Sequence, residues 1–299
     1  MNQKQDSTDK KRGYLRKDFE VFHIKDNRNL NIEFHSHEFH KIIVFISGNV
    51  TYLIEGKTYK LKPWDILLVS SSEIHKPEID QSEIYERIII WVNKEFLKKH
   101  SNEHCCLLTC FELSLSNKKN LIRLNHKAIS DIKNLMNQLE SACESDEFGS
   151  QILKNSYVLQ IVVYISRQLL KNIDNDITND ISYDENIETI LTYINTNLDK
   201  DLFIENIGAK FYMSKYYLMH NFKKQTGYTI HNYIIQKRLI MSKELIKLGK
   251  PITEVYMECG FGDYSNFIRA FRKSFGIAPK KYYKEIIQME NVEKGKKHF

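Results

Sequence analysis

The chain has 299 residues, enough for two ordinary domains, and its 42% hydrophobic content is sufficient for packed cores. Together with only 4 prolines, this content excludes a disordered chain. The formal net charge is +6. The residues from Glu185 onward include 19 basic and 12 acidic side chains, whereas the rest of the chain is almost neutral. A basic half favours a nucleic-acid partner, although a lysine-rich solvated surface has the same sign.

No segment of the sequence indicates export or membrane insertion. Residues 1–13 are charged and lack the apolar core of a secretory signal, so we expect a disordered tail there. The longest apolar runs, such as Ile88–Val92, are far too short to cross a bilayer. The odd number of cysteines, five, favours free thiols, and His104, Cys105, Cys106 and Cys110 lack the spacing of a zinc site. We therefore expect a cytoplasmic protein without membrane contact.

Residues 14–124 contain short β-rich runs separated by turn-forming segments. Several short strands with regular turn signals are typical of a β-sandwich or barrel. We predict strands at Leu30–Phe34, Ile42–Ile46, Val50–Ile54, Ile66–Val69 and Arg87–Val92.

Two histidine-containing segments lie among these strands, Phe34–Lys41 and Glu73–His75. The stretch Val21–Val92 resembles a cupin, a small β-barrel that often precedes the DNA-binding domain of transcription regulators. In metal-binding cupins three histidines and a glutamate hold the ion. Here His35, His37 and His75 fall on the histidine positions, and alternation would place His35 and His37 on one side of a strand. Lys41 occupies the glutamate position, where its positive charge would repel a divalent ion.

Three interpretations of these residues remain open: a metal site, a pocket for a polar or anionic small molecule, and structural histidines without a ligand. We predict the pocket, with no metal and no cofactor. Its predicted effector-binding residues are His35, His37, Lys41 and His75. Tyr52, Trp64 and Trp91 can add apolar walls, although aromatic residues in strands are more often ordinary core.

Residues 125–171 show two amphipathic helical patterns separated by Ser145–Gly149. We expect a helix pair, which either joins two subunits or simply packs on the barrel. Residues 172–184 are rich in Asn and Asp without a helical stripe, so we place the domain linker there.

The C-terminal part, residues 185–287, contains a helix-turn-helix pattern that occurs twice. In the second copy Ile252–Cys259 is helical, Gly260 ends it, and Asp263 caps a helix with Phe267 and Phe271 on its apolar side. Moving back 49 positions places Gly276 on Gly227 and Asp263 on Ser214. The uninterrupted helical pattern Ile230–Leu248 joins the copies, and at 1.5 Å per residue it is roughly 27 Å long. Such a connector suits two reading helices about one DNA turn apart.

This arrangement strongly resembles the AraC-type transcription regulators over about Ile187–Tyr283. The residues that carry the resemblance are Gly260, Phe261, Asp263, Phe267, Arg269, Phe271, Phe275, Gly276, Pro279 and Tyr282, with Arg238 and Leu239 in the linking helix. Two departures affect the first helices, where the family's small alanine is Gly208 in one copy and Tyr256 in the other. A third is Tyr212, which occupies a turn position that favours a residue tolerating positive φ.

The resemblance implies which residues face DNA. Base-facing positions are Tyr216, Met219 and His220 in the first copy, and Tyr264, Ser265, Ile268 and Arg269 in the second. We expect Lys223, Lys224, Arg272 and Lys273 to contact phosphates. Arg269 is the strongest candidate for base reading, because a guanidinium group binds guanine O6 and N7 together.

We therefore predict an α+β multidomain protein: a cupin-like barrel with a helix pair, an all-α DNA-binding domain at 185–287, and a basic tail at 288–299. The predicted function is an AraC-type regulator, acting as a homodimer on two adjacent major grooves of promoter DNA, with an effector and RNA polymerase as further partners. The alternative is a metal-dependent cupin enzyme with an accessory DNA-binding domain, against which Lys41 argues. A third interpretation makes the N-terminal half a pure dimerisation module.

Overall fold

The computed structural model describes residues 15–26, 34–171 and 180–284. The chain divides into two compact units, residues 1–182 and 183–299. The boundary falls inside the predicted linker, most of which, 172–179, lies outside the described residues, as do the two predicted terminal tails.

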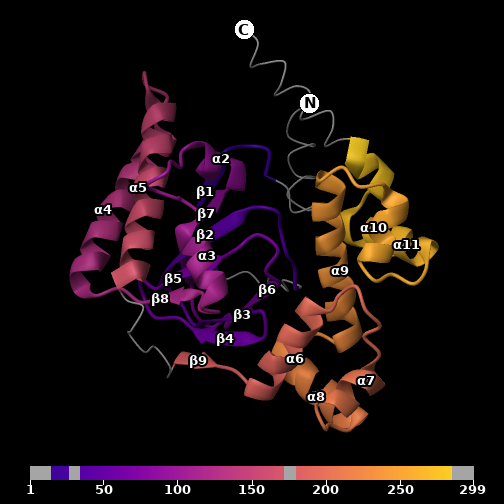
Figure 1. Ribbon diagram of the computed structural model, residues 1–299. Coiled ribbons are helices and arrows are strands. Elements are labelled where there is room, and N and C mark those ends of the chain that lie inside the picture. The colour runs from indigo at the N-terminus through magenta and orange to yellow at the C-terminus, as the bar shows by residue number, and fades with distance from the viewer. Residues whose placement is uncertain (1–14, 27–33, 172–179, 285–299) are drawn as a thin grey trace. The chain divides into compact units, whose positions relative to one another are not determined.

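The N-terminal unit is built on two antiparallel sheets (Figure 1). The five-stranded sheet has the order β1-β7-β2-β5-β8, and the four-stranded sheet has the order β6-β3-β4-β9. Their bounds are β1 Phe19–Asp26, β2 His40–Ser47, β3 Val50–Ile54, β4 Lys57–Lys60, β5 Ile66–Val69, β6 His75–Ile79, β7 Tyr85–Val92, β8 Leu121–Ile122 and β9 Ile181–Ser182.

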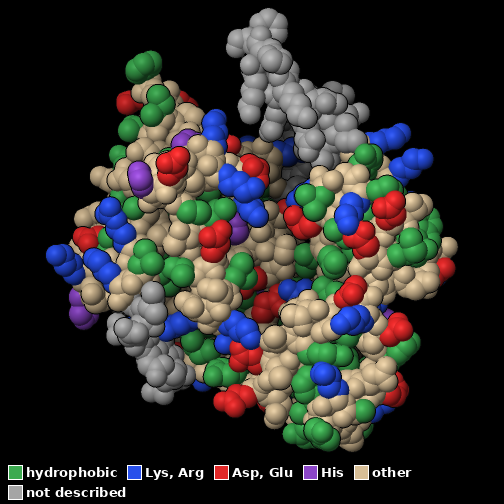
Figure 2. Space-filling view, in the orientation of Figure 1, with side chains coloured by type: hydrophobic (Ala, Val, Ile, Leu, Met, Phe, Trp, Pro, Cys, Tyr) green, Lys and Arg blue, Asp and Glu red, His purple; other side chains and the backbone are tan. Residues whose placement is uncertain are grey.

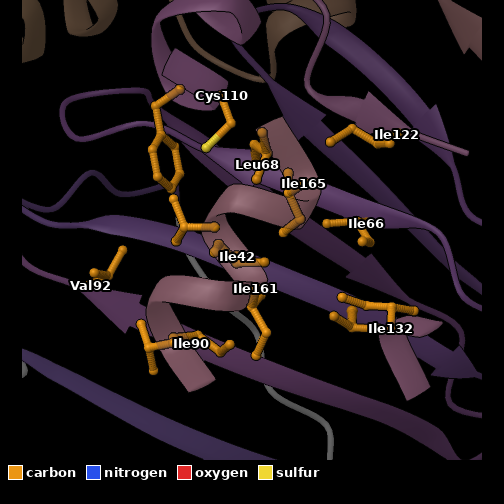
Figure 3. Packing of buried hydrophobic residues seen from close by; sticks show 14 of the residues in the cluster. Ile42, Ile66, Leu68, Ile90, Val92, Cys110, Ile122, Ile132, Ile161 and Ile165 are labelled. Carbon is orange, nitrogen blue, oxygen red and sulfur yellow. The ribbon is translucent and has the colours of Figure 1, made fainter. Parts of the chain in front are cut away.

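Side chains alternate across the five-stranded sheet and so supply two apolar cores. On the inner face Ile43, Phe45 and Leu67 pack with Tyr52 and Tyr59 of the other sheet. The outer face packs against helices, as Figure 3 shows for strand and helix side chains that point toward one another. The outer cluster includes Ile42, Ile66, Leu68, Ile90 and Val92 from strands, with Cys110, Ile132, Ile161 and Ile165 from helices.

Four helices accompany the sheets in this unit: α2 Lys94–Lys99, α3 Thr109–Ser116, α4 His126–Glu144 and α5 Ser150–Lys171. The long α4 and α5 lie side by side against the five-stranded sheet (Figure 1). This confirms the predicted helix pair.

Four of the five predicted strands are present, as parts of β2, β3, β5 and β7. Residues 30–33 of the predicted first strand lie outside the described residues, and Phe34 is not in a strand. The pattern analysis missed β1, β4, β6, α2 and α3, whose sequences are short or rich in charged residues.

The C-terminal unit is helical throughout its named elements, as predicted. Its helices are α6 Glu185–Thr196, α7 Ile204–Lys210, α8 Lys215–Thr226, α9 Ile230–Lys247, α10 Ile252–Glu258 and α11 Tyr264–Phe275. The pairs α7–α8 and α10–α11 are the two helix-turn-helix units, and α9 of 18 residues joins them.

Local capping chemistry defines the second helix of each unit. The Ser214 side chain accepts from the Tyr217 amide at 3.3 Å, and the Asp263 carboxylate accepts from the Asn266 amide at 2.7 Å. Gly227 and Gly276 end the same helices in the left-handed conformation, with φ of 75° and 72°. These four positions confirm the duplication that the sequence predicts.

Candidate nucleic-acid interface and ligand pocket

Helix α11 has one apolar face and one polar face. Phe267, Phe271 and Phe275 are buried, and the Phe271 ring contacts each of the other two edge-on. Arg269, Arg272, Lys273, Tyr264 and Ser265 are exposed on the remaining surface, and Ile268 is half-buried. A helix held by three buried aromatic rings can therefore present a guanidinium group and hydroxyl groups to a major groove.

Asn266 positions the Arg269 side chain on this surface. The Arg269 guanidinium donates to the Asn266 side-chain oxygen at 2.5 Å, one helical turn away. The Asn266 amide nitrogen in the backbone is also the group that the Asp263 cap binds. Sequence reasoning missed Asn266, although its i,i+3 spacing to Arg269 is the signal that points to it.

Helix α8 offers a different surface. Tyr216, Met219 and His220 are exposed, and the Tyr216 and His220 rings lie parallel with centroids 6.3 Å apart. Lys223 and Lys224 are exposed in the last turn. Leu218 and Phe222 anchor the opposite face in the core. The predicted base-facing surface of α8 is thus aromatic and apolar, whereas that of α11 carries an arginine.

The turn between α7 and α8 is one residue shorter than the turn between α10 and α11. Tyr212 adopts a φ of 55°, as the turn position predicts, and its side chain is 98% exposed. A β-carbon on Gly208 would lie 2.8 Å from the Met213 carbonyl oxygen, so glycine fits this crossing where alanine would press on backbone. In the second unit Tyr256 packs on Tyr264 with ring centroids 5.4 Å apart.

Helix α9 carries a half-buried guanidinium group, that of Arg238. Arg238 donates to the carbonyl oxygens of Leu198 at 2.9 Å and Lys200 at 2.6 Å, and its side chain borders Gly260. Burial lowers the pKa of Arg238 from its ordinary value. The residue that carries part of the family resemblance therefore holds the α6–α7 loop to α9.

Surface side chains of the C-terminal unit mix basic, acidic and hydrophobic types. Figure 2 shows hydrophobic side chains on the surface where α7 and α8 lie. The exposed aromatic residues of this region are Phe203, Tyr212, Tyr216 and Tyr217. Lys215 is paired with Glu205 at 2.6 Å, so it fixes α8 to α7 across their turn.

In the N-terminal unit the four predicted pocket residues come together at one end of the space between the sheets. The ring centroid of His75 lies 4.3 Å from that of His35 and 4.9 Å from that of His37. The Lys41 Nζ atom lies 3.0 Å from His75 Nε2. His35 and His37 precede β2 and do not alternate along a strand as expected; His35 instead forms an isolated bridge with His75.

The hydrogen bonds of these histidines assign their ring nitrogens. His75 Nδ1 donates to the Glu73 carbonyl oxygen at 3.1 Å, so its Nε2 accepts from Lys41. His37 Nδ1 donates to the Phe39 carbonyl oxygen at 2.6 Å. Burial lowers the pKa of both histidines well below the ordinary 6.5 and lowers the pKa of Lys41 to about 7.

A cupin-type metal ion does not fit this donor set. Both nitrogens of His75 already have partners, and one of those partners is the lysine at the position of the family's carboxylate ligand. Within the described part of the chain, no group of three or more His, Cys, Asp or Glu side chains is arranged to hold a metal. The cluster is instead a buried group of polar side chains that includes one lysine.

Aromatic side chains lie beside this cluster of His35, His37, Lys41 and His75. The Trp91 ring lies 4.7 Å from Phe39 and 4.7 Å from Phe22, measured between centroids. Of the other aromatic candidates, Tyr52 is bonded to the Tyr85 hydroxyl at 3.1 Å inside the barrel. Trp64 packs outside it, under Lys133 of α4.

Two buried nitrogen atoms here have no hydrogen-bond partner: His37 Nε2 and the Trp91 indole nitrogen. A third atom of this kind, His40 Nε2, lies elsewhere, because His40 stacks on Phe111 of α3. Sequence reasoning could not identify these atoms, since only the packed structure shows which polar groups remain unsatisfied.

The cysteines of the predicted His–Cys cluster differ in exposure. Cys105 and Cys106 are exposed while Cys110 is buried, and all are free thiols. Among the helices formed by residues 15–26, 34–171 and 180–284, none combines the length and hydropathy that crossing a bilayer requires.

Comparison with known proteins gives matches to two family models. Residues 20–162 match an AraC-like ligand binding domain, and residues 207–285 match a helix-turn-helix domain. Two similar relatives come from Mannheimia succiniciproducens. The HTH-type transcriptional activator RhaR is 22% identical over 85% of this chain and 88% of its own length, and the activator RhaS is 25% identical over 82% and 87%.

Among solved structures, ToxT from Vibrio cholerae is 17% identical, covers 89% of this chain and 98% of its own, and has a TM-score of 0.35.

Proposed function

Since this chain belongs to the AraC-type DNA-binding transcription regulators, with a ligand-binding domain ahead of its helix-turn-helix domain, we propose that α8 and α11 read two adjacent major-groove segments of one promoter site. The relatives RhaR and RhaS are named transcriptional activators, and the proposal includes activation through RNA polymerase. It includes no catalytic step and places the protein in the cytoplasm.

One observation carries the DNA-reading proposal: three buried phenylalanine rings fix α11 while Arg269 stands exposed on its other side. Arg269 is held toward the first turn of the helix by Asn266. Recognition helices contact base edges mainly through residues near the N-terminal end. Arg269 is therefore the base-reading residue of the proposal, while Arg272 and Lys273 in the last turn bind phosphates.

The test compares Arg269→Ala with Arg272→Ala on a site obtained by selection from random DNA. Arg269→Ala should cost about 1–3 kcal/mol on the selected site and remove the preference at one base pair. Arg272→Ala should weaken binding to selected and scrambled DNA alike and reduce the slope of log affinity against log salt by roughly 1. The measurement is a fluorescence-anisotropy titration at several salt concentrations.

Equal binding of the wild-type protein to selected and scrambled DNA would contradict sequence-specific reading. If Arg269→Ala weakens both DNAs equally, Arg269 is a phosphate contact and another residue reads the base.

For the N-terminal unit we propose that the pocket of His35, His37, Lys41 and His75 binds a small-molecule effector. Its support is a family model for ligand binding over residues 20–162, together with the buried polar cluster between the sheets. Regulation requires that the effector bind two arrangements of the protein with different affinity.

A further inference from the structure

Three polar groups of the pocket are buried without the partners that their chemistry requires. Lys41 is 8% exposed and its ammonium group contacts neutral His75, and no carboxylate among the described residues lies against it. His37 is 5% exposed, and its Nε2 atom has no partner. The Trp91 indole N–H also lacks an acceptor. Trp91 lies directly opposite Lys41 in the register of β7 and β2, so both side chains leave the sheet on the same face.

We infer that this cluster binds a small 2-hydroxy carboxylate, whose carboxylate meets Lys41 and the Trp91 N–H and whose hydroxyl group donates to His37 Nε2. The inference rests on the proposed effector role of this pocket and names the chemical class of the effector.

The carboxylate follows from the uncompensated cation. A buried ammonium group costs much free energy unless an opposite charge and hydrogen bonds accompany it. His75 supplies only a lone pair, because its Nδ1 proton is used on the Glu73 carbonyl oxygen. A carboxylate supplies the missing charge, and its second oxygen can accept the proton of the Trp91 indole.

The hydroxyl group follows from the tautomer of His37. Because Nδ1 donates to the Phe39 carbonyl oxygen, Nε2 is a lone-pair acceptor and needs a donor. An ionised carboxylate has no proton to give, so a simple carboxylic acid would leave His37 unsatisfied. The Phe39 ring stacks on His37 at 4.1 Å and touches Trp91, which gives the carbon skeleton of the ligand an apolar wall.

The sign of the pH dependence is fixed by Lys41. The titratable groups that face it are His75 on β6 with His37 and His35 before β2; Glu20 on β1 lies opposite Trp91 and is paired with Lys17. Burial keeps the pKa of His37 and His75 well below 6.5, so both stay neutral. Burial lowers the pKa of Lys41 to about 7, and an anion raises it again. Binding must therefore take up a proton above pH 7, and affinity should fall by up to about tenfold per pH unit there.

The experiment is isothermal titration of the full-length protein with matched ligands. One set is lactate, propionate and lactamide, and a second set with an aromatic group is mandelate, phenylacetate and mandelamide. Within at least one set the hydroxy acid should bind, and loss of either the hydroxyl group or the charge should weaken binding about tenfold or more. At pH 8, enthalpies measured in two buffers of different ionisation heat should show proton uptake by the wild-type protein.

Three variants assign the contacts. Lys41→Met should remove the preference for acid over amide, and His37→Phe should remove the preference for the hydroxy acid over the plain acid. The control is His40→Phe, which replaces another buried histidine with an unsatisfied Nε2 atom but lies against α3; binding should be unchanged. The wild-type proton uptake keeps the test decisive if a pocket variant fails to fold.

Amides that bind as tightly as acids, or binding without proton uptake, would overturn the inference. Absence of binding by both hydroxy acids at millimolar concentration would also overturn it, and the unsatisfied atoms would then be sites for buried water. The DNA titrations separate the two proposals. If the protein discriminates between selected and scrambled DNA but binds none of the hydroxy acids, only this inference is rejected. Acid binding without such discrimination rejects the DNA-reading function alone.

Discussion

At Tyr212 the backbone adopts a conformation that side chains with a β-carbon avoid. Its φ of 55° lies in the left-handed region, and the ring gains no compensating burial because it is 98% exposed. The corresponding turn of the second unit has Gly260, with a φ of 77°, at this point. Short-range chemistry of this kind can be recognised from sequence, because a turn position and its cap residues lie within a few positions of each other.

We expect Tyr212→Gly to raise the free energy of unfolding of the C-terminal unit by about 1 kcal/mol, since glycine adopts this φ without strain. Tyr212→Ala is the matched control, because it removes the ring and keeps the strain, so stability should not rise. Urea unfolding followed by far-UV circular dichroism measures the change. Tryptophan fluorescence follows the N-terminal unit separately, since both tryptophans, Trp64 and Trp91, lie there. A gain with alanine equal to that with glycine would assign the effect to the ring.

The opposite change at Gly260 should destabilise the unit. A β-carbon at this position would press on the Leu198 carbonyl oxygen and lie 2.8 Å from the Arg238 Nη2 atom, in addition to the strain of a positive φ. The contacts of Lys41, in contrast, cannot be predicted from the residues near it in sequence. Its position suggests an effector pocket, but its bond to His75, 34 residues away, comes from the fold.

Among the elements, the two-residue strand β9 shows how the end of the predicted linker is attached to the barrel. It pairs with β4 at Thr58 and Tyr59, and an ionic network lies beside it. Arg123 is bonded to Asp65 at 2.6 Å and also to Asp180, the residue before β9; Lys62 contacts Asp180 at 2.7 Å. Sequence could not predict β9, because two residues carry no periodicity and their pairing depends on a partner more than a hundred positions away.

Arg123→Met should lower the free energy of unfolding of the N-terminal unit by about 3 kcal/mol, because it leaves the buried carboxylate of Asp65 without its guanidinium partner. Lys62→Met removes a side chain that is 60% exposed and contacts only Asp180 in this network, so it should cost about 0–1 kcal/mol. Tryptophan fluorescence during urea unfolding compares the two variants. Equal losses would mean that the buried pair with Asp65 contributes no more than a surface contact.

The long elements were the most predictable. The α4–α5 pair, α8, α9 and α11 follow from sustained helical periodicity and from caps. Strands β1 and β6 were missed because His23, Lys25 and Lys76 interrupt their alternation. His23 contacts Glu140 of α4 at 2.7 Å and Glu86 of β7 at 2.9 Å. Strand β1 is therefore held by tertiary contacts of polar side chains and lacks a regular alternation of apolar and polar residues.

At the scale of the whole molecule, the surface of α5 carries apolar residues that packing within the chain leaves exposed. Ile152 is 73% exposed and Leu153 is 49% exposed, and Figure 2 shows hydrophobic side chains at the end of the α4–α5 pair. A groove of about 610 Å³ runs along this surface, lined by residues that include Leu135, Ile152, Leu159 and Val163. Exposed apolar surface of this kind is typical of interaction sites.

We propose that a second copy of the chain covers this surface, with α5 packed against its equivalent about a twofold axis. Twofold symmetry places each Ile152 against the same surface of the partner, so one substitution acts twice. Ile152→Asp should shift the dimer to monomer in sedimentation equilibrium at micromolar concentration, because it places a carboxylate in an apolar contact.

The control for this change is Leu248→Asp, which alters a residue that is 76% exposed in the C-terminal unit and should leave the mass unchanged. A dimeric regulator can bind two operator sites at the same time, and binding at the first site favours binding at the second. Ile152→Asp should therefore also remove cooperative binding to tandem sites, while binding to a single site persists. A wild-type protein that sediments as a monomer, or an Ile152→Asp variant that remains a dimer, would place the interface elsewhere. A loss of single-site binding in Ile152→Asp would instead mean that the substitution disturbs the fold.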